Sequence, residues 1–519
     1  MINNWHIPRN KRKLYPVVDI LSLFTLQNLG DVWRQNLDRH LNFEEELERY
    51  GLKREGHRRD QRGGGARTYE SWLYNLGLIF IDTKLNVIRT TLAGEALLSG
   101  QPPVPIITNQ LMKLQYPSPY STRKRVDIHY RFQVRPFRFL LQLLSDTRIK
   151  ALNKEEIGRF VITEGENESN RCVEQVISRI QDYREHGDSI LTESFDQSYT
   201  SSTTGVRSRK ATLSYLEDIA NTFINYLEYT QIITRGDKGV IYIKKEMEEQ
   251  VSRILSDGSD LRSFNPNHPF GNEIFQRHFG LAPGGNRDNR NFGGQVVTDE
   301  MYRIRRIRSD FLHIAGLKPI VNTTISLIRE IAENTGYTVN QVEEALESFR
   351  PDTFSAFETS YLNMAISGTE LATEFEIATK DIFIQLGFDA AHVGSNALHP
   401  DILVNSPSGY SGIIDTKAYR AYSISNDHKN RMVKNYIPTF IEKSENLVFF
   451  MYIADGFGKN ISDQIRKVSS ESKINGCVLT AHNLVSILQK HMIKSIDHHK
   501  LHRLFTSNSR IELQDIEKL

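Results

Sequence analysis

Hydrophobic positions form their most regular pattern in the last third of the chain. Apolar residues recur at helical spacing through residues 369–386, and Gly387 follows as a C-terminal stop. Short apolar runs at 401–404, 412–418 and 447–453 are typical of strands. A further helix, strand and helix are expected at 461–468, 476–480 and 483–494. This alternation of helices and strands predicts an α/β domain with a mixed central sheet.

Two segments of the first half share another order of elements: a helix, a hairpin and a second helix. In residues 70–100 the strands are expected at 78–81 and 87–89, around a polar turn. The second segment covers residues 215–255, with its hairpin at 231–243. Winged-helix modules have this wiring and often present a helix to the DNA major groove. Unrelated α+β domains have it as well, so the pattern alone favours DNA binding only slightly.

Two breaks indicate how the chain divides. Residues 256–298 are rich in Gly, Asn, Pro and Asp and are typical of a long loop or irregular arm. Pro351 disfavours helix at the residue before it, which favours a boundary near 350. We therefore expect a multidomain α+β and α/β protein in four parts. These are a recognition region with a winged-helix-like module at 1–145, a second such module at 146–265, a loop and helical connector at 266–350, and the α/β domain at 351–519.

Composition restricts the class of protein. Of the 519 residues, 39% are hydrophobic and 25% are charged, which is ordinary for a soluble protein with more than one domain. No run approaches the roughly 18 consecutive apolar residues of a membrane span. Residues 1–13 do not have the pattern of a secretory signal. The two cysteines, Cys172 and Cys477, cannot form a disulfide framework. We expect a cytoplasmic protein without a membrane partner.

The formal net charge of +2 says little about partners, but the basic residues are clustered. Three clusters lie at 53–67, 123–138 and 303–308, and aromatic residues are interleaved in the second. Such stretches suit DNA phosphates, because each neutralised phosphate releases condensed counterions. A solvated surface balanced by acids elsewhere explains them equally well. The candidates for DNA contact are Arg58, Arg59, Arg123, Lys124, Arg125 and Arg131.

The candidate chemistry lies on two successive strands, which carry Pro400-Asp401 and Asp415-Thr416-Lys417. Side chains alternate along a strand, so Asp415 and Lys417 project from one face while Thr416 points away. A hairpin-like return would bring Asp401 beside Asp415. Two carboxylates and a backbone carbonyl, that of Thr416, form an oxygen-rich site suited to Mg²⁺ with retained waters. The metal would stabilise charge on a phosphodiester and acidify a bound water, which Lys417 would orient or help to deprotonate.

This arrangement is the PD-(D/E)xK pattern of metal-dependent nucleases. The segments on either side of it strengthen this interpretation. Matching segments follow in one order: Gly394-Ser395, His399-Pro400-Asp401, Gly412 to Tyr419, Phe449 to Asn460, Asn475 to Thr480, and His502 to Phe505. Through these segments residues 370–515 resemble the cleavage domain of FokI-type, type IIS restriction endonucleases. The resemblance implies that Asp401 and Asp415 bind metal and that Lys417 is catalytic. It also implies an auxiliary acid, for which Glu374 is the candidate.

The same resemblance implies a transient homodimer. The FokI-type family cleaves both strands by pairing two cleavage domains through a helix. That helix carries an aspartate and an arginine four residues apart, facing the second copy. Asp427 and Arg431 have this spacing here. The alternative is a pair within one helix, worth about 0.2–0.5 kcal/mol.

Three segments of the first half, Asn75 to Asp82, Thr91 to Leu97 and Lys113 to Pro117, carry a second resemblance. They make residues 70–145 similar to AlwI-type endonucleases and related strand-nicking enzymes. This similarity implies recognition of a short, asymmetric duplex sequence with cleavage at a fixed distance to one side.

Together the two resemblances predict a type IIS restriction endonuclease that acts on double-stranded DNA in a bacterial or archaeal cytoplasm. The nearest alternative is a site-specific nicking enzyme, whose weakened self-association leaves one strand uncut. A structure-specific or modification-dependent nuclease is a further alternative. The most distant is a non-catalytic DNA-binding regulator with a decayed nuclease fold, against which the intact Asp401, Asp415 and Lys417 argue.

Overall fold

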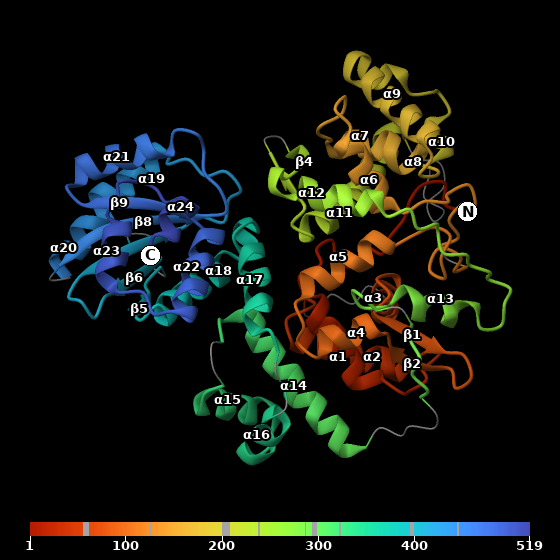
Figure 1. The fold of residues 1–519 in the computed structure, drawn as a ribbon, viewed down its shortest axis with the longest axis horizontal. Coiled ribbons are helices and arrows are strands. Elements are labelled where there is room, and N and C mark those ends of the chain that lie inside the picture. The colour runs from red at the N-terminus through yellow and green to blue at the C-terminus, as the bar shows by residue number, and fades with distance from the viewer. Residues whose placement is uncertain are drawn as a thin grey trace. The chain divides into compact units, whose positions relative to one another are not determined.

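The computed structural model describes the chain except residues 55–61, 125, 200–207, 237–238, 286, 293–297, 321–322, 348, 350, 395–398 and 444–445 and the side chain of Lys443. The described residues form two compact units (Figure 1). The N-terminal unit comprises Met1–Ser309 and Glu344–Pro351, and the C-terminal unit comprises Asp310–Glu343 and Asp352–Leu519. The four-part division expected from the sequence stays a prediction.

In its described residues, the first part of the N-terminal unit has three helices before its hairpin. Its elements are α1 (Val17–Asn28), α2 (Leu37–Arg49), α3 (Gly64–Asn75), β1 (Ile79–Asp82), β2 (Val87–Thr90), α4 (Leu92–Leu98), α5 (Pro103–Lys113) and α6 (Pro136–Ser145). The strands β1 and β2 are antiparallel, with Ile79 opposite Thr90. The helix, hairpin and helix expected within residues 70–100 are therefore present.

The rest of the N-terminal unit holds a second hairpin. Its elements are α7 (Lys154–Glu156), the π-helical η1 (Ile157–Val161), α8 (Ile162–Glu164), α9 (Asn170–His186), η2 (Gly187–Ile190), α10 (Phe195–Ser198), α11 (Arg209–Tyr229), β3 (Ile233–Arg235), β4 (Ile241–Ile243), η4 (Lys245–Met247), α12 (Glu248–Ser256) and α13 (Gly271–Phe279). The antiparallel pair β3 and β4 follows the long helix α11, as expected, with Ile233 opposite Ile243.

Helix α13 corrects one expectation, because it lies inside the stretch 256–298 that we expected to be loop or irregular arm. Its Phe275 and Phe279 are buried, one helical turn apart. The side-chain amide of Gln276 donates to the carbonyls of Tyr74 and Ile79 at 2.7 and 3.2 Å. Tertiary packing against β1 thus stabilises a short helix that the surrounding Gly-, Pro- and Asn-rich sequence hides.

Two helices cross the boundary between the units, α14 (Asp299–Leu317) and α16 (Val339–Glu347). The C-terminal unit continues through α15 (Ile325–Thr335), α17 (Thr353–Met364), η5 (Gly368–Glu370), α18 (Ala372–Gln385), β5 (Asp389–His392), β6 (Ile402–Asn405), β7 (Ser411–Thr416), α19 (Asn426–Arg431), the π-helical η6 (Met432–Tyr436), α20 (Ile437–Lys443), β8 (Leu447–Ala454), α21 (Ile461–Ser472), β9 (Asn475–Thr480), α22 (Ala481–Ile493), α23 (His498–Phe505), β10 (Ser509–Arg510) and α24 (Leu513–Glu517).

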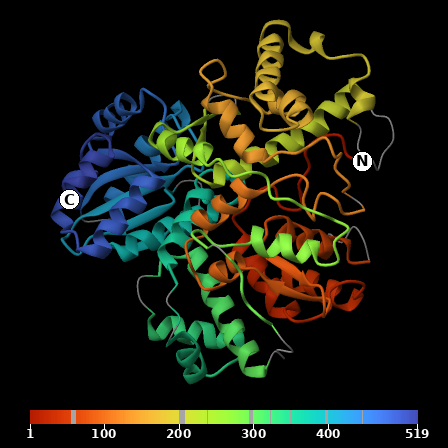
Figure 2. The same ribbon diagram turned by 45° about the vertical axis from the view of Figure 1, so that its right-hand side comes forward.

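Across its described residues, the C-terminal unit is built on one six-stranded sheet in the order β10-β9-β8-β7-β6-β5. The pairs from β5 to β7 are antiparallel and those from β7 to β10 are parallel, which confirms the expected mixed sheet. Side chains alternate across β8. Met451 belongs to the core under α17, α18 and α22, and Phe450 belongs to the core under α20 and α21. Helices therefore cover both faces of the sheet (Figure 2).

No helix within the described ranges is long and apolar enough to cross a membrane.

Candidate active site

The antiparallel pairing of β6 and β7 brings the two expected carboxylates together. Ile402 lies opposite Ile414, so Asp401 and Asp415 are the next pair along the ladder. The backbone N–H of Asp401 donates to the carbonyl of Ile414 at 3.1 Å. Ile402 and Ile414 both belong to the core on one face of the sheet. By alternation the two carboxylates project from the other face, at the end of both strands.

Thr416 and Lys417 complete the cluster with four hydrogen bonds. The Thr416 side chain was expected to point away from the site, but its hydroxyl donates to Asp401 Oδ2 at 2.9 Å, and its backbone N–H donates to the same oxygen at 2.6 Å. The Lys417 ammonium donates to Asp415 Oδ2 at 2.7 Å and to the Thr416 carbonyl at 3.0 Å. The structure thus brings together all four residues that the sequence placed in one site.

The charges of this cluster are strongly coupled. Burial and the neighbouring charge of Asp415 raise the pKa of Asp401 to about 7, although Lys417 opposes the shift. Burial alone would lower the pKa of Lys417, but the charges of Asp415 and Asp401 hold it above its ordinary value. Lys417 is therefore an ammonium at neutral pH, while Asp401 exchanges its proton close to neutrality.

Three tyrosines surround Asp415 on the same face of the sheet. Burial raises the pKa of Tyr422, Tyr436 and Tyr452, and the charge of Asp415 raises each of them further. Tyr452 lies opposite Asp415 on β8, and Tyr436 ends the π-helical turn η6. Neutral rings exclude water from this side of Asp415, and a low local dielectric strengthens its interactions with nearby charge.

The raised pKa of Asp401 predicts how the stability of the metal-free protein depends on pH. The folded-state pKa of about 7 lies above the ordinary Asp value of about 3.9. Between these values the folded state holds a proton that the unfolded state has lost, so the free energy of unfolding falls as pH rises from about 4 to 7. We expect Asp401→Asn to remove this loss. The free energy of unfolding of Asp401→Asn, relative to that of wild type, should be about 2–3 kcal/mol larger at pH 8 than at pH 5.

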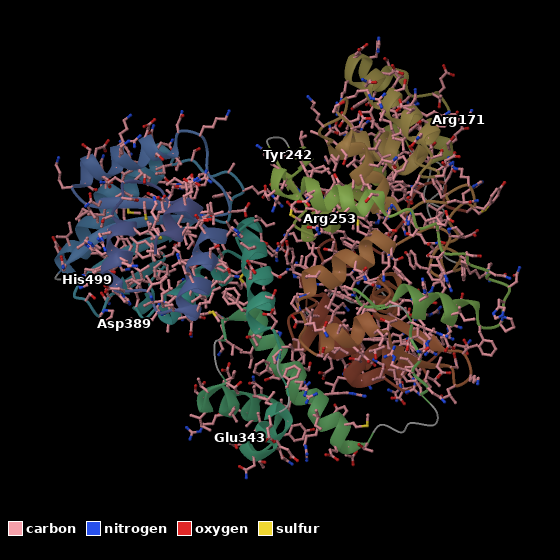
Figure 3. All side chains as sticks on the ribbon, in the orientation of Figure 1. Arg171, Tyr242, Arg253, Glu343, Asp389 and His499 are labelled. Carbon is pink, nitrogen blue, oxygen red and sulfur yellow. The ribbon has the colours of Figure 1, made fainter. Side chains whose placement is uncertain are left out.

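Urea unfolding in a chelator at the two pH values measures this difference. Asp389→Asn is the matched control, because Asp389 is exposed and is the first residue of β5, at the end of this strand away from Asp401 (Figure 3). An equal effect of Asp401→Asn at pH 5 and pH 8 would contradict the assigned shift.

A third carboxylate, Glu376, was missed in the sequence. A Cβ atom on Gly394 would lie 3.3 Å from Glu376 Oε2 and 3.4 Å from Asp401 Oδ1, so both carboxylates flank this glycine. The charge of Glu376 contributes to the raised pKa of Asp401. Glu376 Oε2 also lies 2.6 Å from His392 Nε2 on β5. Glu374, two residues earlier on α18, has an exposed side chain. Its role as the auxiliary acid stays a prediction.

The expected pairing residues lie on α19. Arg431 and Asp427 form an ion pair of 2.8 Å within this helix, and their side chains are 47% and 64% exposed. Both groups are therefore accessible to a second molecule, while they also satisfy the intrahelical alternative. Their contact with a second copy stays a prediction.

The candidates for DNA contact differ in whether their charges are paired with other groups of the protein. Arg58, Arg59 and Arg125 lie outside the described residues. The Arg123 guanidinium donates to both carboxylate oxygens of Glu70 at 3.0 Å and to the Ser71 hydroxyl at 2.7 Å. These partners favour a structural role for Arg123.

Arg131 is paired within the protein, whereas Lys124 is exposed. Arg131 pairs with Glu166 and donates to the Thr163 carbonyl at 2.7 Å and to Asn3 Oδ1 at 2.9 Å. Its partners also favour a structural role. Lys124 is exposed, and within the described part of the chain it forms no salt bridge. DNA contact by these residues stays a prediction.

Metal-binding capacity rests on the two aspartates and the Thr416 carbonyl. Among the described residues, no group of three or more His, Cys, Asp or Glu side chains is arranged to hold a metal ion. Two carboxylates at the end of adjacent strands and the carbonyl of the residue after Asp415 are nevertheless the hard oxygen ligands that Mg²⁺ accepts together with water and phosphate oxygens. Burial and the neighbouring charge of Asp415 together raise the pKa of Asp401, and a divalent cation would relieve the repulsion between the two carboxylates.

Both halves of the chain match families of restriction enzymes. Residues 336–512 match the family described as "FokI, cleavage domain", and residues 70–270 match "Restriction endonuclease BpuJI - N terminal". Two solved structures are similar over 98% of this chain and 99% of theirs. They are restriction endonuclease FokI, at 14% identity, and FokI bound to DNA, at 13%, each with a TM-score of 0.29. A TM-score this low does not establish a common overall arrangement. No curated protein matches the chain.

Proposed function

This chain is a restriction endonuclease, a site-specific deoxyribonuclease, and from that premise we propose how it acts. It binds double-stranded DNA at a short asymmetric sequence through the N-terminal unit, in which the two helix-and-hairpin segments act as winged-helix-like modules. The C-terminal unit hydrolyses phosphodiester bonds at a fixed distance to one side. The observation that carries this proposal is the cluster of Asp401, Asp415 and Lys417 within a FokI-type cleavage domain. An AlwI-like mode of recognition by residues 70–145 is part of the same proposal.

Mg²⁺ is the cofactor that fits the donor set. Asp401, Asp415 and the Thr416 carbonyl would hold it, as hard oxygen donors at one end of the sheet. When bound, it would supply Lewis-acid stabilisation of the phosphodiester and acidify a water molecule.

The chain's own residues have distinct roles in this proposal. Thr416 orients Asp401 through two hydrogen bonds to one carboxylate oxygen. Lys417 stays protonated, so it offsets phosphate charge and orients the attacking water by donating hydrogen bonds. Because phosphoryl transfer depends mostly on positioning and electrostatics, these roles are sufficient without a covalent intermediate.

Glu376 is our candidate for the auxiliary acid, in place of Glu374. Its carboxylate lies beside Gly394 together with that of Asp401, and His392 contacts it on the other side. We expect Glu376→Gln to lower the rate of cleavage about 10- to 100-fold, the usual cost of disturbing groups around a metal site. Glu374→Gln should retain near-wild-type activity, because its side chain is exposed.

Cleavage rates of the two variants under one set of conditions decide between these acids. The pair is closely matched, since both variants remove one carboxylate from the same helix. Loss of activity in Glu374→Gln with a normal Glu376→Gln would return the role to Glu374.

Double-strand cleavage is proposed to depend on transient pairing of two cleavage domains through Asp427 and Arg431. If so, a one-site plasmid should pass from nicked to linear DNA with a rate that rises more steeply than linearly with enzyme concentration. The measurement is the ratio of linear to nicked product across a dilution series. Nicked product at every concentration would favour the strand-nicking alternative. A strictly linear dependence would contradict pairing.

A further inference from the structure

The edge strand β5 ends beside the active site and brings a histidine there. His392, its last residue, lies opposite Ile402, the residue after Asp401. The backbone N–H of Val393 donates to the carbonyl of Asp401 at 2.8 Å, so the end of β5 is fixed to the strand that carries the carboxylate. Directly opposite residues share a face of a sheet, and Ile402 belongs to the core under α18. The imidazole of His392 therefore projects toward α18.

A carboxylate of α18 accepts a hydrogen bond from this imidazole. His392 Nε2 lies 2.6 Å from Glu376 Oε2. A carboxylate can only accept, so Nε2 carries the proton and donates. Hydrogen bonds to an ionised acceptor are roughly twice as strong as those between neutral groups. The two side chains are only 27% and 19% exposed, which limits the competition from water for this contact.

His392 is also the one side chain that holds Glu376 in the part of the chain that the structure describes. Lys380, one helical turn further along α18, pairs with Asp381 at 2.9 Å instead. The ion pairs among the described residues give Glu376 no lysine or arginine. A glutamate side chain without a partner samples several rotamers, because fixing one of them costs conformational entropy. The orientation of the Glu376 carboxylate therefore depends on His392.

This orientation matters because Asp401 lies next to Glu376. A Cβ atom on Gly394 would lie 3.3 Å from Glu376 Oε2 and 3.4 Å from Asp401 Oδ1. The Glu376 oxygen that accepts from His392 is thus the same oxygen that lies beside Gly394 and Asp401. Like charges repel, and the charge of Glu376 contributes to the raised pKa of Asp401. The imidazole therefore holds Glu376 in a position that electrostatic repulsion opposes.

We propose that His392 is a positioning residue for cleavage, which holds the Glu376 carboxylate beside Asp401 by donating from Nε2. The inference rests on the proposed function, in which Glu376 is the auxiliary acid. Without the imidazole, repulsion by Asp401 would turn the glutamate side chain away from the site. Loss of His392 should therefore reproduce the defect of Glu376→Gln without adding to it.

Single-turnover cleavage by the full-length protein tests this proposal, on a duplex with the sequence that wild-type digestion selects. His392→Leu has no donor, so its rate should fall about 10-fold, within the usual cost of disturbing groups around a metal site. His392→Gln should retain most of the wild-type rate, because its amide nitrogen can donate from about the position of Nε2. His499→Leu is the matched control and should cut like wild type, since His499 is exposed at the start of α23 (Figure 3).

A double-variant cycle separates positioning from a general effect on the fold. In the Glu376→Gln background, His392→Leu should lower the rate no further, because the two residues act through one contact. A substitution that merely disturbed β5 would lower the rate by the same factor in both backgrounds. Gel-shift affinity for the same duplex in a chelator is the second readout. It should match that of wild type in every variant.

If His392→Leu fails to fold, His392→Asn replaces it, because the shorter amide does not reach Glu376. A wild-type protein that selects no sequence overturns the proposed function and this inference together. A wild-type rate in Glu376→Gln overturns the role of both residues but leaves cleavage itself in place. A defect in Glu376→Gln alone, or equal losses from His392→Leu in the two backgrounds, overturns the positioning role of His392.

Discussion

We expect replacement of Lys417, Asp415 or Asp401 by alanine to abolish cleavage while site-specific DNA binding persists. Each side chain supplies charge at the reacting phosphodiester, and removing one well-placed electrostatic group costs about 10³-fold in rate. Loss of Lys417 also leaves Asp415 without the ammonium 2.7 Å away. We expect the cleavage rate of each variant to be at least about 10³-fold below that of wild type. Because the three groups act as one unit, the losses should not add up in the double variants.

Gel-shift affinity and plasmid cleavage measured on the same preparations separate chemistry from binding. Asp389→Ala is the control, as an exposed aspartate at the far end of β5 (Figure 3). It should cut like wild type. Retained cutting by all three alanine variants would overturn the site, and loss of binding in parallel with cutting would show that the substitutions disturb the fold.

Arg123→Leu is expected to destabilise the N-terminal unit, because Arg123 is a structural residue there. Its guanidinium pairs with Glu70, whose side chain is only 7% exposed, and stacks over Tyr74 at 4.1 Å. Removing it leaves a buried carboxylate without its partner. Breaking such a pair costs about 3–5 kcal/mol, whereas replacing both partners by apolar residues costs far less. The double variant Glu70→Leu, Arg123→Leu should therefore recover part of the loss.

Tryptophan fluorescence during urea unfolding is a direct readout, because all three tryptophans, Trp5, Trp33 and Trp72, lie in the N-terminal unit. Lys124→Ala is the neighbouring control and should change the unfolding free energy by less than about 0.5 kcal/mol. An unchanged unfolding midpoint in Arg123→Leu, with weakened DNA binding, would instead identify Arg123 as a DNA contact.

The hairpin of the active site was predictable because its information is local. Short apolar runs fix β6 and β7, alternation fixes the shared face of Asp415 and Lys417, and the turn between the strands fixes their antiparallel pairing. The strand β5 was not predictable in the same way. Its residues, Asp389–His392, are alternately exposed and half-buried at the edge of the sheet, so no apolar run marks them.

Glu376 and Arg123 show why contacts between distant segments were harder to predict. Glu374 and Glu376 flank the buried stripe of α18 on opposite sides, so helical periodicity alone does not choose between them. The choice depends on Gly394 and His392 from other elements. Arg123 was expected to contact DNA because it lies in a cluster of basic residues. Its partner Glu70 lies on a different helix, and only the folded chain reveals the pair.

Helix α13 was not predicted for the same reason. Its own sequence is short and lies among Gly, Pro and Asn residues, which favour loops. Its stability comes from burying Phe275 and Phe279 and from the hydrogen bonds of Gln276 to the first hairpin. Local patterns predicted elements with a long buried face, whereas short elements held by distant partners needed the structure.

We propose that the cluster of Asp401, Asp415 and Lys417 cleaves DNA at a fixed distance from one short sequence. The most direct test is digestion of mixed-sequence DNA with Mg²⁺, followed by sequencing of the ends produced. We expect ends at a constant offset from one asymmetric motif, on both strands, and no such ends with a chelator or with Asp415→Ala. Ends without a shared motif, or ends equally abundant with Asp415→Ala, would contradict it.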